Sequence, residues 1–300
     1  MKTCSLMIGV VVLCRAGVVG GDVKHDAAEL RVLIKKLEPL HKRLGPPARG
    51  DWLASHEEAG QTFDQYLQSS PLTPTGKRRT VYIQPLGEFS AKQREILKLT
   101  AEFMGLYFDR PVMIQKDVPL AKIPSRARRV HPQWGMPQVL TSYVLDDLLK
   151  PKLPPDAAAF LALTTSDLWP GEGWNFVFGQ ATLRDRVGVW SLYRNGEPER
   201  GADEFRACLS RALRTATHET AHMFSLKHCI LYECNMCGSN NREEADRHPL
   251  YLCPQCTAKI CWATGSDPVA QFRKLAEFSR IHGLRREEQY YRDAVKALTP

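Results

Sequence analysis

The chain has 300 residues, of which 43% are hydrophobic, and it carries a formal net charge of +8 at pH 7. This length and hydrophobic content suffice for one large domain or two small ones. The sequence contains no internal repeat and no long low-complexity segment, which excludes repeat architectures. Basic clusters at Lys77-Arg78-Arg79 and Arg126–Arg129 are short, and no nucleic-acid motif accompanies them, so solvated loops are the favoured interpretation.

The first 21 residues predict a secretory signal peptide. Lys2 precedes an apolar run from Leu6 to Leu13, and small residues follow. This run is too short to span a bilayer as a helix, and no later segment qualifies as transmembrane. We therefore expect export, to the periplasm or the exterior. The alternative is a cytoplasmic protein that keeps its N-terminus.

Residues 22–76 are predicted to form a helical N-terminal extension. Apolar spacing indicates an amphipathic helix over residues 26–44, followed by a break at Gly45-Pro46-Pro47. Helical structure is expected again over residues 50–70. The Pro- and Gly-containing stretch 71–76 predicts a linker.

Residues 77–300 are predicted to form one domain of α/β (α+β) type. Apolar and β-branched runs indicate its strands, and 3.6-residue periodicity indicates its helices. The expected strands are Thr80–Pro85, Val112–Ile114, Ala158–Thr164, Trp174–Phe178 and Arg186–Tyr193. The expected helices are Ser90–Leu106, Gln138–Leu149, Asp203–Phe224 with Asp203 as N-cap, and one or two after Pro268. Residues 115–137 are expected to be loop.

A histidine-rich segment, His218–Cys229, reads H-E-T-A-H-M-F-S-L-K-H-C. His218 and His222 are four residues apart, so a helix places both on one face, where they can bind one metal ion. Glu219 lies beside that ion, in the position of a water-activating base. His228 can join as a ligand only if the chain bends back. Three neutral imidazoles with an open fourth position are typical of a catalytic zinc site.

Six cysteines follow within 33 residues: Cys229, Cys234, Cys237, Cys253, Cys256 and Cys261. Four of them form two CxxC pairs, Cys234/Cys237 and Cys253/Cys256, which are separated by fifteen residues. This spacing predicts a four-cysteine structural zinc site. From spacing alone the ligand set stays open, because Cys229 can take the place of Cys237. A disulfide framework is the competing interpretation.

The joint pattern resembles the archaemetzincin (archaelysin) family of the metzincin clan. The family joins HExxHxxGxxHC to Cx4CxM and a later CxxC, and His218–Cys229, Cys234–Met236 and Cys253–Cys256 match these elements. Weaker similarity extends over most of residues 50–262. It includes Asp51–Leu53, Glu57-Glu58, Tyr82–Gly87, Trp174–Ala181, Val187–Ser191, Gly238–Asn240 and Glu243–Asp246.

The resemblance implies a zincin or metzincin-like fold, with a mixed twisted sheet, an active-site helix and a small C-terminal subdomain. In that subdomain residues 229–262 would hold a structural zinc, and residues 267–298 would form helices. It favours Cys229 over Cys237 as a ligand and makes Met236 the Met-turn residue beneath the metal site. The implied structural ligands are Cys229, Cys234, Cys253 and Cys256.

One position departs from the family pattern. Ser225 stands where the family has the glycine of the bend between the helix and His228. Glycine suits such a bend because it adopts positive φ without steric cost. Serine in the same conformation costs about 1 kcal/mol or more. We expect the bend to survive because the neighbouring Cys229 is fixed by the second metal.

Together these features predict a zinc metallopeptidase with two zinc ions per chain, one catalytic and one structural. His218, His222 and His228 hold the catalytic zinc, and Glu219 is the general base that activates water against a peptide or protein substrate. The similarity to metzincins further implies that a strand bordering the cleft, which we take to be Trp174–Ala181, holds the substrate by strand addition. The alternatives are a catalytically idle zinc-binding scaffold, and a zinc-ribbon nucleic-acid-binding protein in which HExxH is incidental.

Overall fold

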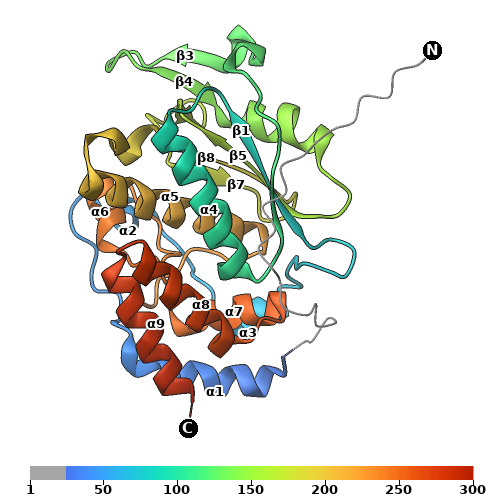
Figure 1. The fold of residues 1–300 in the computed structure, drawn as a ribbon, viewed down its shortest axis with the longest axis vertical. Coiled ribbons are helices and arrows are strands. Elements are labelled where there is room, and N and C mark those ends of the chain that lie inside the picture. Colours follow the sequence, from blue (N-terminus) through green and yellow to red (C-terminus); the bar gives the residue numbers. More distant parts are fainter. Residues whose placement is uncertain (1–24, 300) are drawn as a thin grey trace.

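The fold is built on a five-stranded sheet in the order β2-β1-β5-β8-β7 (Figure 1). A computed structural model describes residues 25–299, so the predicted signal peptide lies outside the described residues. The strands are β1 Thr80–Leu86, β2 Val112–Ile114, β5 Ala157–Thr164, β7 Gly179–Ala181 and β8 Val187–Ser191. Four of them run parallel, and β7 pairs antiparallel with β8 at one edge. The expected mixed α/β class is confirmed.

The central strands are hydrophobic on both faces because both faces are covered. Successive side chains of a strand point to opposite sides, and in β1 Val81 and Ile83 join one core while Tyr82 and Leu86 join a second. The first core contains residues of α4 (Ala91–Phe108) and α5 (Ala202–Met223). The second contains the π-helical segment Tyr143–Leu149.

A second, three-stranded sheet departs from the sequence-based expectations. It consists of β3 (Arg128–Val130), β4 (Pro137–Leu140) and β6 (Asp167–Trp169), in that order. The prediction of loop over 115–137 was therefore wrong at β3. The helix predicted over Gln138–Leu149 was wrong in its first turn, because Gln138–Leu140 pair with Asp167–Trp169. Backbone pairing with a distant strand overrides local helical spacing here.

The strand predicted at Trp174–Phe178 was also misplaced. Within it only Val177 makes a β-bridge, to Leu168, and the regular strand is the following Gly179–Ala181. Aromatic side chains suggested a strand, but the ring of Phe176 instead receives the Arg194 guanidinium, 3.6 Å from its centroid. The predicted edge strand thus lies a few residues later in the chain.

The N-terminal helices are shorter than expected. They are α1 Ala27–Leu37, α2 Trp52–Ser55 and α3 Phe63–Gln68. The helix predicted over 26–44 ends early because Pro39 follows Leu37 closely, and a 3₁₀ turn, Glu38–Leu40, closes it. The continuous helical structure expected over 50–70 is likewise replaced by two short helices. Residues 71–76 contain no helix or strand, as predicted.

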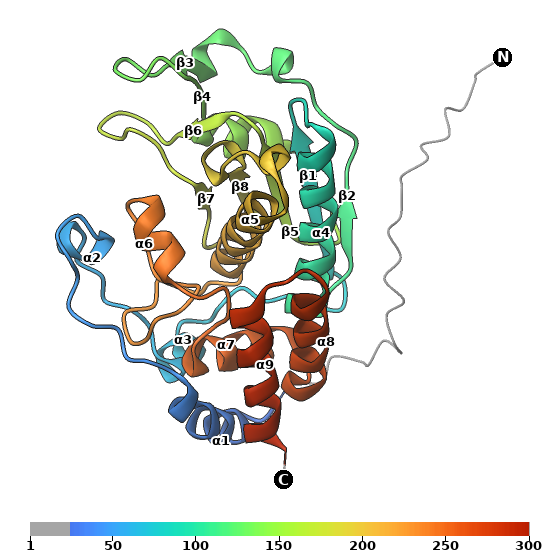
Figure 2. The ribbon, with the colours of Figure 1, turned by 60° about the vertical axis from the view of Figure 1, so that its left-hand side comes forward.

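The C-terminal part contains four helices, α6 Arg242–Arg247, α7 Pro254–Thr264, α8 Pro268–Ile281 and α9 Arg285–Leu298. Helices α7, α8 and α9 lie with α1 and α3 at the end of the molecule away from β3 and β4 (Figures 1 and 2). Residues of α1, α3, α7, α8 and α9 share the first core with α4 and α5. None of the described helices is long and apolar enough to cross a membrane.

Short 3₁₀ turns connect these elements. Besides Glu38–Leu40 they are Leu120–Lys122, Ser125–Ala127, Lys150–Lys152, Tyr193–Asn195 and Pro198–Arg200.

Candidate active site

Helix α5 carries the first two histidines at its C-terminal end. Its buried face includes Leu209, Leu213 and Ala216 at helical spacing, which packs the helix against the sheet. His218 and His222 extend the same helix by two further turns. The helix begins one residue earlier than predicted, at Ala202, because Gly201 is the N-cap; Asp203 lies in the first turn and does not cap it.

The chain leaves α5 through a left-handed bend at Ser225, whose φ is +66°. The Leu226 N–H donates to the Ala221 carbonyl (3.1 Å), which closes the helix end. The Ser225 hydroxyl donates to the Leu183 carbonyl (3.1 Å) and accepts from the Leu72 N–H (2.9 Å). The bend therefore survives with serine, as expected, and hydrogen bonds that glycine cannot make offset the strain.

These contacts predict an unusual order of stability at position 225. Ser225→Ala keeps the strain and leaves the Leu72 N–H without its acceptor, so the free energy of unfolding should fall by about 1–3 kcal/mol. Ser225→Gly loses the same hydrogen bonds but relieves about 1 kcal/mol of strain, so it should be more stable than Ser225→Ala. Urea unfolding of the zinc-loaded proteins measures both, and an alanine variant as stable as the glycine variant would contradict the account.

The bend brings the three histidines together. The ring centroids of His218, His222 and His228 lie 4.6, 5.3 and 5.0 Å apart in pairs. Each Nδ1 is bonded to an oxygen: His218 to the Asn235 carbonyl (2.8 Å), His222 to the Leu226 carbonyl (2.7 Å) and His228 to a carboxylate. Carbonyl oxygens only accept, so these Nδ1 atoms carry the protons and the Nε2 atoms offer lone pairs.

This arrangement fits a metal cation. The Nε2 atoms of His218 and His222 lie only 3.0 Å apart, with no proton available to join them. Burial and the neighbouring histidines lower the pKa of His222 to about 3 and the pKa of His218 well below its usual value. Both rings are therefore neutral near pH 7, which is the form that binds metal.

The carboxylate that orients His228 is Glu58, a residue that spacing alone did not identify as part of the site. Its Oε1 accepts from His228 Nδ1 at 2.6 Å and from Trp52 Nε1 at 2.9 Å. Burial opposes the charge, yet these bonds hold the pKa of Glu58 below its usual value. A carboxylate behind a histidine fixes its tautomer and raises its basicity as a ligand. In the sequence, Glu58 was included only in the weaker family similarity at Glu57-Glu58.

Glu219 lies against the edge strand β7. Its side chain is buried, and burial raises its pKa to about 8 when only the protein's own groups act on it. A Cβ atom at Gly179 would lie 2.6 Å from Glu219 Oε1 and 2.8 Å from its Cγ and Cδ. Position 179 must therefore lack a side chain for the carboxylate to occupy this place.

Gly179→Ala should consequently act on catalysis more than on folding. Gly179 does not have a positive φ, so alanine fits the backbone, but Glu219 must move by several tenths of an ångström or more. If Glu219 is the general base that the sequence predicts, kcat should fall by about a hundredfold, the effect of misplacing a reacting group by about 1 Å. The control is Gly105→Ala in α4, where the nearest atom would be 3.5 Å away. Unchanged peptide hydrolysis by Gly179→Ala would contradict this positioning.

A cleft with a volume of about 620 Å³ contains the three histidines and Glu219. Its walls come from α5, from the segment Pro170–Ala181 that includes β7, and from residues 237–248 around α6. Trp52 also lines the cleft and stacks on Trp174, with 6.3 Å between the ring centroids. Figure 2 shows α2, which begins at Trp52, beside α6. The N-terminal segment thus forms part of the cleft.

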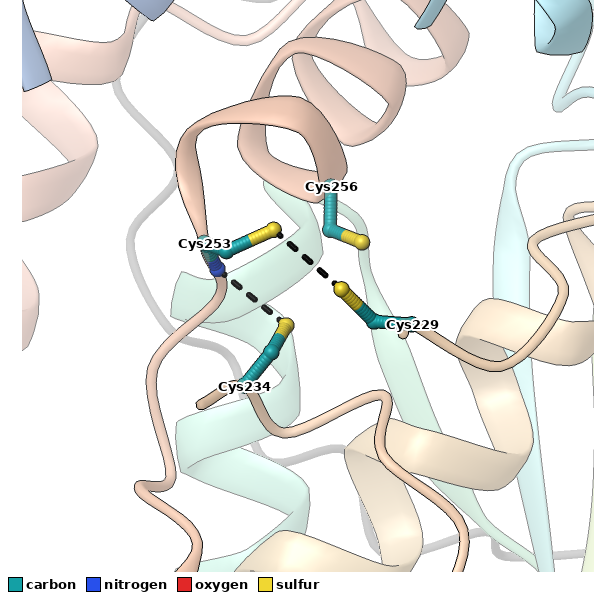
Figure 3. A group of neighbouring side chains, drawn as sticks. All are labelled: Cys229, Cys234, Cys253 and Cys256. Carbon is teal, nitrogen blue, oxygen red and sulfur yellow. Dashed lines mark hydrogen bonds between the residues drawn. The ribbon is translucent and has the colours of Figure 1, made fainter. Parts of the chain in front are cut away.

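The structure also gathers four cysteines. The Sγ atoms of Cys229, Cys234, Cys253 and Cys256 are buried and lie within 4.8 Å of one another (Figure 3). Cys253 and Cys256 come from the start of α7, and the other two come from the loop that follows His228. The Sγ of Cys234 accepts from the backbone N–H groups of Met236 (3.4 Å) and Cys253 (3.2 Å). Four converging sulfurs match a closed tetrahedral zinc site.

Cys237 lies outside this group. Its Sγ donates to the Tyr232 carbonyl at 3.3 Å. Of the two sets that the spacing left open, the structure therefore assembles the one with Cys229. No disulfide joins any of the cysteines within residues 25–299. Met236 is fully buried between Cys234 and Cys237, and its neighbour Asn235 provides the carbonyl that holds His218.

Comparison with known proteins identifies the family. The chain is 32% identical over 290 residues to archaemetzincin-2 of Homo sapiens, an alignment that covers 85% of this chain and 80% of the human protein. The match to archaemetzincin-2 of Pongo abelii has the same identity and coverage. The chain belongs to the archaemetzincin family. The model of "Peptidase family M54" matches residues 155–261, which contain all three histidines and all four clustered cysteines.

A solved archaemetzincin from Methanopyrus kandleri shares the fold, with a TM-score of 0.50 and 25% identity. The match covers 99% of that chain and 64% of this one. This archaemetzincin is therefore a zinc metallopeptidase by family, and the predicted family, fold and enzyme class are confirmed.

Proposed function

We propose that this archaemetzincin hydrolyses peptide bonds at a zinc ion held by His218, His222 and His228, with Glu219 as the general base. The observation that carries the proposal is the convergence of three imidazole Nε2 atoms beside a buried carboxylate in one cleft. Each imidazole is oriented through Nδ1 by a separate oxygen, which fixes the tautomer that a metal ligand needs.

A zinc ion held by the three histidines would supply Lewis-acid polarisation of the scissile carbonyl and would lower the pKa of a bound water toward ~7. Glu219 takes the proton of the attacking water on a carboxylate oxygen and then delivers it to the nitrogen of the leaving amine. Its burial supports this role, because a carboxyl group whose pKa lies near the working pH can both accept and return a proton. The positive charge of a bound zinc ion would lower that pKa from the value of about 8 set by burial alone.

The substrate backbone is proposed to pair with β7. This strand lies at the edge of the main sheet, uses one side to pair with β8 and lines the cleft. A free strand edge offers N–H and C=O groups to an extended peptide, which supports binding by strand addition. The expected binding segment Trp174–Ala181 thereby narrows to Gly179–Ala181.

The four-cysteine cluster is proposed to hold a second, structural zinc, with thiolates of Cys229, Cys234, Cys253 and Cys256 as ligands. Closure by four protein ligands leaves no position for water, so the site stabilises without reacting. Cys229 directly follows His228, so this metal would also fix the position of the third histidine. We further propose that residues 1–21 direct export of the enzyme, and that residues 22–76 and 77–300 form an N-terminal extension and the catalytic domain.

A peptide-cleavage assay combined with metal analysis tests the proposal. The purified full chain should contain two zinc ions and cleave members of a random peptide library. Mild chelation should remove activity, and added zinc should restore it, while the cysteine-bound zinc stays in place. A protein that retains two zinc ions but cleaves no peptide would support the alternative of an idle zinc-binding scaffold.

A further inference from the structure

One charged side chain in the cleft has no role in the mechanism above. Arg214 lines the same cleft as the histidines and precedes His218 by four residues on α5. Four residues advance a helix by about 6 Å, so Arg214 lies one turn along the floor of the cleft from the first metal ligand. An extended peptide spans that length with about two residues.

The guanidinium of Arg214 is poorly satisfied by the protein. Its side chain is only 13% exposed, and its one hydrogen bond to the described residues is the ion pair from Nη1 to Asp246 Oδ1, which is long at 3.4 Å. The buried Nε has no partner among the described residues. Asp246 is instead engaged by Arg211, with three contacts of 2.7, 3.1 and 3.1 Å. A guanidinium has five N–H donors, and only one of those of Arg214 is recorded in a hydrogen bond to the described residues.

A second polar group in the cleft is also unpartnered. His248 is 8% exposed and lines the cleft, and neither of its ring nitrogens has a hydrogen-bond partner among the described residues. Burial lowers the pKa of His248 to about 4, and the positive charges of Arg214 and Arg247 contribute to a smaller extent. The ring is therefore neutral and can donate one hydrogen bond. Buried polar groups without partners are uncommon in proteins and point to a ligand that satisfies them.

We propose that Arg214, with His248 beside it, forms an anion-binding subsite that takes a carboxylate of the substrate within about two residues of the scissile bond. The proposal rests on the peptidase function. One planar guanidinium and one neutral imidazole match the single charge of a carboxylate, which Arg binds through two parallel hydrogen bonds. The carboxylate belongs either to an acidic side chain or to the C-terminus of the peptide; the chemistry of recognition is the same.

Binding measurements separate this subsite from turnover. The zinc-loaded Glu219→Gln protein is titrated with fluorescent peptide pairs that differ by Asp against Asn, Glu against Gln, or a free C-terminus against an amide. At least one acidic member should bind about tenfold tighter or more, as expected for hydrogen bonds to a charged group. A preference confined to the terminal pair identifies the C-terminal carboxylate, and a preference in the side-chain pairs identifies an acidic residue.

Variants assign the preference to Arg214. Arg214→Gln should abolish the difference in Kd within the preferred pair but leave the Kd of the neutral member within about twofold. Arg214→Lys keeps the positive charge but lacks the planar guanidinium that forms two parallel hydrogen bonds. It should retain only part of the difference in Kd. The matched control, Arg206→Gln, removes an arginine from the same helix that does not line the cleft. Zinc content and thermal unfolding verify that each variant folds, and the lysine variant decides the question if the glutamine variant does not.

The subsite is refuted if no acidic peptide binds better than its neutral partner, or if the preference survives in folded Arg214→Gln. Failure of the peptidase function is a separate result. It would appear as absence of cleavage by the wild type for every peptide, including those that the Glu219→Gln protein binds.

Discussion

Replacing Glu219 with Gln is expected to lower kcat for peptide hydrolysis by about a thousandfold or more while both zinc ions stay bound. Glutamine has nearly the same shape and fills the space beside Gly179, but its amide cannot accept the proton of the attacking water. The loss is therefore chemical rather than structural. Single-turnover kinetics on a cleavable peptide, with zinc content measured on the same sample, provides the test.

The control for this substitution is Glu277→Gln in α8, an exposed carboxylate paired with Arg280 far along the chain from the cleft. It should leave kcat within about twofold, because exposed ion pairs contribute little. If Glu219→Gln kept wild-type activity, the base would have to be another group. Glu58, whose carboxylate is hydrogen-bonded to His228, would then be the first candidate.

Replacing Cys253 with Ser is expected to prevent stable folding. Structural zinc in small domains contributes about 10–16 kcal/mol of apparent binding free energy, which is as large as the whole net stability of about 5–15 kcal/mol of a typical protein. The cluster also joins the loop after His228 to α7, so its loss should disorder the third histidine as well. Zinc content should fall from two ions to one or none, with a large loss of the cooperative thermal transition monitored by circular dichroism.

Cys237→Ser is the matched control because this cysteine lies within the same loop but outside the cluster. A serine hydroxyl can still donate to the Tyr232 carbonyl, so zinc content should stay at two. If Cys237→Ser released zinc and Cys229→Ser did not, the ligand set of a simple zinc ribbon would be correct. A disulfide between Cys253 and Cys256, found by mass spectrometry without reduction, would exclude the structural zinc altogether.

The parts of the site that could be predicted are those encoded at short range. Helical spacing predicts that His218, Glu219 and His222 lie together. The separation of the two CxxC pairs predicts the four-cysteine site. Glu58, Arg214 and Gly179 could not be found in this way. Glu58 contacts a histidine that lies 170 residues later in the chain. Arg214 stands out because its buried Nε has no hydrogen-bond partner among the described residues. Gly179 stands out because a side chain at this position would collide with Glu219.

The same distinction explains the errors in the fold. The buried parallel strands β1 and β5 were predicted almost correctly because both of their faces are apolar. The short strands β3, β4 and β6 have weak local patterns and depend on pairing with partners up to about thirty residues away, for example Gln138 with Asp167. Such strands are determined by tertiary context, which local propensity does not contain.

The hydrogen bond between Glu58 and His228 has a consequence for the order in which the enzyme is made. The segment that carries Trp52 and Glu58 is held by residues synthesised much later: Lys259 Nζ donates to the Gln61 carbonyl, and Phe63 N–H donates to Gln255 at 2.7 Å. While the chain is still on the ribosome, residues 52–63 emerge long before these partners exist. A growing chain therefore has no complete cleft until about residue 260 has emerged, so the cleft can form only after the cysteine-rich segment has been made.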